Sequence, residues 1–151
     1  MTNDKAVSVL NNLIETCKDG EKGFKEAAEG LKSADIKAKF MEYSRERAQM
    51  AAELQAEVRR LGGDPDKSGS MSASLHRGWM DLKAAVSGHD DHAIVSEAER
   101  GEDVAKKAYE DALKSADVSG TALPLVQQQA AKVRRVHDEV RDIRDRRTAT
   151  T

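Results

Sequence analysis

Aromatic residues make up only 3% of this 151-residue sequence, and proline occurs twice. Alanine, leucine and charged residues dominate instead, a composition that favours helix over sheet. The one cysteine, Cys17, cannot form a disulfide within the chain and fits a reducing compartment, so a cytoplasmic location is expected. A chain of this length forms about one domain, and we expect a single domain over residues 1–151.

Long apolar runs are also absent, so we expect no signal peptide and no membrane span. The formal net charge is only −2, and acidic and basic residues alternate along the chain. No strong field therefore attracts nucleic acid or an anionic membrane, and neither partner is expected. The sequence contains no nucleophile triad, phosphate-binding loop or dinucleotide fingerprint, so we predict no catalytic residues or organic cofactor.

Apolar residues recur at alternating spacings of three and four through most of the chain, as on the buried face of packed helices. Ser33 is a good N-cap, and Gly62, Gly63 and Pro65 end the second helical pattern. The helices predicted from these signals cover about residues 3–30, 33–62, 71–87, 89–116 and 121–147.

The short turns join long helices pairwise, whereas the segment between the second and third long helices is long enough to cross the bundle. The expected fold is all-α: an antiparallel four-helix bundle, ferritin-like, with a short extra helix in the long crossover. Trp79 lies in an apolar stripe of this crossover helix. We interpret the stripe as core packing, with an oligomer interface as the alternative.

Ionisable residues interrupt the apolar faces at several places, and burial of such groups is costly unless they have partners. Glu21, Arg47, Glu102 and His137 each occupy a position between apolar residues of their own helix, and Glu46 borders the same stripe as Arg47. The glycines at 20, 23 and 101 stand beside the first and third of these interruptions and could allow close helix approach. Counting residues from the turns places Glu21 level with Glu46, and Glu102 level with His137.

The segments CKDGEKGFKEAAEG, LHRGWMDLK and SEAERGEDVAKKAYEDAL resemble an uncharacterised bacterial family of ferritin-like four-helix-bundle proteins. The resemblance extends over roughly residues 7–147 and implies the fold, but it implies no established activity. Ferritin-like di-iron proteins use a single Glu from each of two helices and a Glu-x-x-His from each of the other two. Glu21 and Glu102 would match the two single glutamates.

Two departures weaken the di-iron interpretation. The second helix offers Glu46-x-x-Gln49 and the fourth offers Arg134-x-x-His137, so one histidine and one glutamate are missing. A reduced iron or zinc site built from Glu21, Glu46, Glu102 and His137 remains as a metal hypothesis. The structural alternative, which we favour, is that these groups form a polar network with Arg47.

Three functions are consistent with these observations. The first is a non-catalytic structural or interaction protein, connected with stress only by analogy and able to form a homo-oligomer. The second is a metal-binding protein that uses the four residues named above. The third is a helical adaptor that presents the Trp79 segment to a partner.

Overall fold

The computed structural model describes residues 2–66, 79, 81–88 and 90–150. Within these residues every regular element is a helix: α1 (Thr2–Gly30), α2 (Ala34–Arg60), α4 (Leu82–Ser87), α5 (Asp91–Lys114) and α6 (Ala122–Thr150). The all-α prediction is therefore confirmed. Most of the predicted crossover helix, residues 71–78 and 80, lies outside the described residues, and α4 is its described end.

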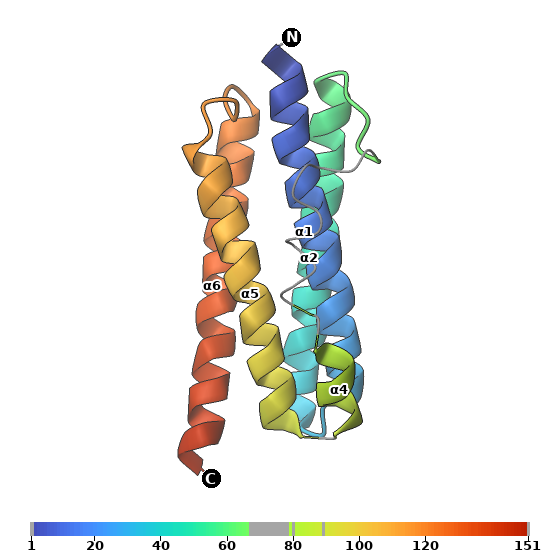
Figure 1. Ribbon diagram of the computed structural model, residues 1–151, viewed down its shortest axis with the longest axis vertical. Coiled ribbons are helices and arrows are strands. Elements are labelled where there is room, and N and C mark those ends of the chain that lie inside the picture. The colour runs from blue at the N-terminus through green and yellow to red at the C-terminus, as the bar shows by residue number, and fades with distance from the viewer. Residues whose placement is uncertain (1, 67–78, 80, 89, 151) are drawn as a thin grey trace.

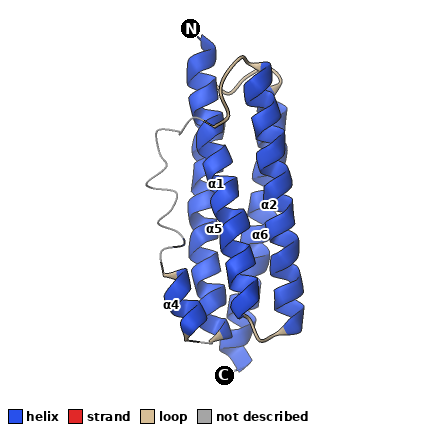
Figure 2. Cartoon of the chain, turned by 90° about the vertical axis from the view of Figure 1, so that its right-hand side faces the viewer, coloured by secondary structure: helices blue, strands red, loops and turns tan. Residues whose placement is uncertain are grey.

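The four long helices lie side by side and form an elongated bundle (Figure 1). Helices α1 and α2 make one hairpin, and α5 and α6 make the other (Figure 1). The short helix α4 packs against α1 and α5 at the end of the bundle where α5 begins (Figure 2). No helix of the described chain combines the length and apolar character that a membrane span requires.

The sequence signals at the helix ends act as expected. The Ser33 hydroxyl accepts a hydrogen bond from the Ile36 amide at the start of α2, and Asp90 accepts one from the His92 amide at the start of α5. Gly62 and Gly120 follow α2 and precede α6 with φ angles of 84° and 57°, which side-chain-bearing residues rarely adopt. These residues fix where the chain turns.

Asp91 ties the two hairpins together at one end of the bundle. Its side chain is buried in the first turn of α5, and its two carboxylate oxygens accept hydrogen bonds from the amides of Lys32 and Ser33, at 2.8 and 3.0 Å. These amides belong to the turn between α1 and α2, so one carboxylate satisfies two backbone donors and aligns the start of α5 with that turn.

The hydrophobic core consists of two clusters that occupy successive parts of the bundle. The cluster near the N-terminus of α1 includes Leu10, Leu13, Ile14, Cys17, Met50, Leu54, Val58, Tyr109, Val126 and Val133. The other cluster includes Phe24, Leu31, Phe40, Tyr43, Leu82, Ile94, Val95, Val136, Val140 and Ile143. Arg47 lies between Tyr43 and Met50 along α2, so a layer of charge separates the two apolar halves.

Polar side chains cross-link α2 to α6 along their length. The contacts follow one another along the two helices and include three hydrogen bonds of 2.6 to 2.8 Å. These cross-links join Thr121 to Glu57, Gln129 to Met50, Arg135 to Glu46, and Glu139 to Tyr43. Because the partner numbers fall along α2 as they rise toward and along α6, these two helices run in opposite directions.

Candidate functional site

A buried ion pair lies at the centre of the bundle. Arg47 on α2 and Glu102 on α5 are 1% and 0% exposed, and the Arg47 Nη2 atom donates to both Glu102 carboxylate oxygens, at 2.5 and 2.8 Å. Burial raises the pKa of Glu102, and the guanidinium opposes that effect. Removal of either partner would leave a buried charge without compensation, so the two residues form one structural unit.

The α1 sequence makes room for this pair. A Cβ atom at Gly20 would lie 2.8 Å from Arg47 Nη1, so any larger residue there would displace the guanidinium. One helical turn further along α1, the Phe24 ring lies 5.7 Å from the guanidinium carbon and offers its face to the cation. Gly20 and Phe24 thus position Arg47 in an otherwise apolar interior.

Two further glycines receive the side chain of Trp79. A Cβ atom at Gly23 of α1 would lie 2.5 Å from the indole, and one at Gly101 of α5 would lie 2.3 Å from it. The indole also meets the Phe24 ring edge-on, with 5.2 Å between the centroids. The half-buried indole therefore packs against its own bundle. The two glycines make room for this side chain rather than for a neighbouring helix backbone.

A second buried polar chain runs through the first apolar half. The Tyr109 hydroxyl donates to Gln129 Oε1 at 2.7 Å, and Gln129 Nε2 donates to the Met50 carbonyl oxygen at 3.1 Å and to a Glu53 oxygen at 3.0 Å. The Cys17 sulfur lies 3.2 Å from the same hydroxyl. Burial raises the pKa of the Cys17 thiol to about 11, so this cysteine is an inert core residue.

His137 on α6 is 6% exposed, and carboxylates contact both of its ring nitrogens. The Nε2 atom lies 2.7 Å from an Asp103 oxygen and 3.5 Å from a Glu99 oxygen, while Nδ1 lies 3.0 Å from an Asp138 oxygen. Burial and the neighbouring Asp103 charge raise the pKa of Glu99. Within the described part of the chain, Glu99, Asp103 and His137 have ligand atoms within 4.8 Å of one another.

The structure gives the four predicted metal ligands different partners. Glu102 binds Arg47, Glu46 forms a two-oxygen contact with Arg135 at 2.6 and 2.8 Å, and His137 lies beside Asp103. Glu21 is half-buried, because Gly20 takes the core position of this turn. In the described chain, no three of these four residues bring their possible metal-ligand atoms close together. Metal binding by them stays a prediction.

The sequence interpretation missed Glu99 and Asp103. It considered only positions on the apolar seam of α5, and these two residues border that seam on the side that faces α6. Their spacing of four residues, which places both carboxylates on one helical face, was the available signal.

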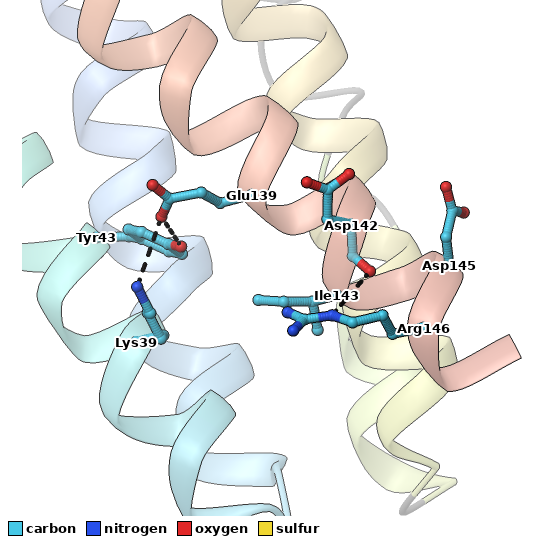
Figure 3. Close-up of a pocket in the computed structure, with 7 residues that line it drawn as sticks. All are labelled: Lys39, Tyr43, Glu139, Asp142, Ile143, Asp145 and Arg146. Carbon is cyan, nitrogen blue, oxygen red and sulfur yellow. Dashed lines mark hydrogen bonds and ion pairs between the residues drawn. The ribbon is translucent and has the colours of Figure 1, made fainter. Parts of the chain in front are cut away.

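A groove of about 420 Å³ lies between α2 and α6, and Figure 3 shows the residues that line it. The Tyr43 hydroxyl donates to Glu139 at 2.6 Å on one wall, and Lys39 approaches the same carboxylate at 3.8 Å. Ile143 supplies an apolar surface beside them. Arg135 is a third partner of Glu139, at 3.7 Å, so this carboxylate is already paired and links α6 to α2.

These features define an all-α helical bundle with a charged layer between two apolar core halves. The chain belongs to the family described as Domain of unknown function (DUF2383), which it matches over residues 5–115. That match contains Gly20, Arg47, Trp79 and Glu102, whereas His137 lies beyond it. A comparison with curated proteins found no match.

Proposed function

We propose that this chain is a non-catalytic helical bundle of ferritin-like arrangement that acts as a structural or interaction protein. The observation that carries the proposal is the Arg47–Glu102 pair. Both oxygens of the Glu102 carboxylate accept hydrogen bonds from one guanidinium nitrogen. A metal ion in the bundle core, held by carboxylates, would have to bind these same oxygens.

Charge supports the same conclusion. A cation bound by Glu102 would lie beside the Arg47 guanidinium, which is itself fully buried and has Glu102 as its ion-pair partner. Two positive charges within a few ångströms repel strongly in a water-poor interior. Displacement of Arg47 would in turn leave an uncompensated buried cation. The pair therefore favours a structural role for Glu102, which the ferritin-like resemblance would assign to iron.

An iron oxidation assay tests the proposal. Metal-free protein is mixed with Fe(II) in air, and Fe(III) formation is followed by absorbance for the wild type, Glu102→Gln and Glu110→Gln. Glu110 is an exposed carboxylate on the same helix and serves as the matched control. We expect all three proteins to oxidise iron at the rate of buffer alone. Faster oxidation by the wild type and Glu110→Gln that Glu102→Gln abolishes would contradict the proposal.

Self-association is a further part of this proposal, because a structural or interaction protein can act through a second copy of itself, and a homo-oligomer is one form of this function expected from the sequence. Sedimentation equilibrium over a 100-fold concentration range gives the mass directly. A mass above that of one chain is expected, and a monomer at all concentrations would remove self-association from the account.

A further inference from the structure

The imidazole of His137 has carboxylates at both ring nitrogens. Asp138 lies 3.0 Å from Nδ1, and Asp103 lies 2.7 Å from Nε2, with Glu99 at 3.5 Å from the same nitrogen. A neutral imidazole carries only one N–H. Whichever nitrogen bears that proton, the other presents a lone pair to a carboxylate, so the arrangement calls for positive charge at the ring, supplied either by a second ring proton or by a cation held at Nε2.

Two nearby arginines supply part of this positive charge, but neither contacts the His137 ring in the described contacts. Arg144 contacts the far side of Glu99 at 3.0 Å, and Arg141 contacts Asp138 at 3.5 Å. Three carboxylates and two guanidinium groups leave one negative charge around a neutral imidazole. The remaining negative charge lies on the Nε2 side, where Glu99 and Asp103 converge, and either a ring proton or a bound cation offsets it.

The ligand atoms have the spacing of a coordination site. In a tetrahedral zinc site with bonds of about 2.0–2.1 Å, neighbouring ligand atoms are roughly 3.3 Å apart. The two distances from Nε2 are 2.7 and 3.5 Å, so shifts of under an ångström would bring both oxygens to that separation. Glu99 and Asp103 are four residues apart on α5, so one helical face presents both carboxylates to His137.

We propose that Glu99, Asp103 and His137 bind a divalent transition-metal ion of the zinc type, through two carboxylate oxygens and His137 Nε2. The Nδ1–H group then donates to Asp138, which is the usual outer-shell partner of a metal-bound histidine. The Asp103 side chain is 57% exposed, so solvent reaches the ion and supplies its remaining ligand. Mixed imidazole and carboxylate ligands suit Zn²⁺. This site shares only His137 with the ligand set predicted from the sequence.

Calorimetric titration of metal-free protein with ZnCl₂ tests the site. We expect one Zn²⁺ per chain in the wild type and at least tenfold weaker binding in Asp103→Asn and His137→Gln. Asp103 is largely exposed, so Asp103→Asn keeps the fold, and circular dichroism checks this for each variant. Glu110→Gln, on the same helix, should bind as the wild type does.

Arg144→Gln gives a readout that a purely structural network would not produce. Its removal frees Glu99 from a competing cation and should tighten Zn²⁺ binding severalfold. No binding by the wild type, or equal binding by the wild type and Asp103→Asn, would overturn the proposal. The Arg47–Glu102 pair uses none of the three proposed ligands, so urea unfolding of variants of that pair tests its structural role independently of Zn²⁺ binding.

Discussion

Replacement of Gly101 by alanine separates two opposing physical effects at the Trp79 slot. In a helix interior the change from glycine to alanine stabilises by about 1 kcal/mol, because alanine has less backbone freedom to lose. At Gly101 the new Cβ would lie 2.3 Å from the indole, far inside van der Waals contact. The indole cannot retreat freely, because Gly23 on α1 faces the same ring.

The sizes of these two effects decide whether Gly101→Ala stabilises or destabilises the protein. Overpacking of this kind typically costs about 1–3 kcal/mol, so the steric term should exceed the propensity gain in the wild type. We therefore expect Gly101→Ala to lower the free energy of unfolding by up to about 2 kcal/mol. In a Trp79→Ala background the clash disappears, and the same substitution should raise the free energy of unfolding by up to about 1 kcal/mol.

Urea unfolding followed by circular dichroism at 222 nm measures all four proteins of this cycle with one probe. Circular dichroism is preferred because Trp79 is the only tryptophan, so fluorescence is lost in two of the proteins. A stabilising effect of Gly101→Ala in the wild-type background would refute the argument that Gly101 exists to admit the indole. An equally destabilising effect in both backgrounds would refute it as well.

Two further predictions concern titratable groups. The pKa of Cys17 is about 11, so roughly one thiol in a thousand is ionised at pH 8; reaction with a disulfide reagent at that pH should be at least about 100-fold slower in the native protein than in urea. A hydrogen bond from Arg60 holds the pKa of Glu57 below its ordinary range. Its stabilising contribution is therefore complete above about pH 4.3 and is lost as the pH falls through the folded-state pKa. At pH 7 the wild type should have a larger free energy of unfolding than Glu57→Gln, and this difference should disappear at low pH. A difference that does not change with pH would contradict the lowered pKa of Glu57.

The sequence predicts the helices well because their signals are local. Heptad spacing, the Ser33 cap and the glycines near 62 and 120 each act within a few residues, and the helices end close to these signals. The position of Glu21 was harder to assign, since a core face can pass from Cys17 to Phe24 through residue 20 or residue 21. The structure uses residue 20, because the space there belongs to the Arg47 side chain.

Side-chain partners across helices are less predictable, because they depend on rotation and register between helices that sequence spacing does not fix. Arg47 and Glu102 were both recognisable as charges on apolar faces, yet their mutual contact joins residues 55 positions apart. The carboxylates beside His137 were overlooked for the same reason, as they border the seam of α5 and become relevant only once α6 is placed beside it. The roles of the mid-helix glycines likewise depend on which distant side chain reaches them.

The most direct test of the structural role of the Arg47–Glu102 pair is a double-mutant cycle in urea with Arg47→Met, Glu102→Leu and the combined variant. Each single change leaves a fully buried charge without its partner and should reduce the free energy of unfolding by about 3–5 kcal/mol. The combined variant removes both charges at similar volume and should be more stable than either single variant. Additive losses, or a loss below about 1 kcal/mol in the single variants, would contradict the claim that this pair holds the centre of the bundle.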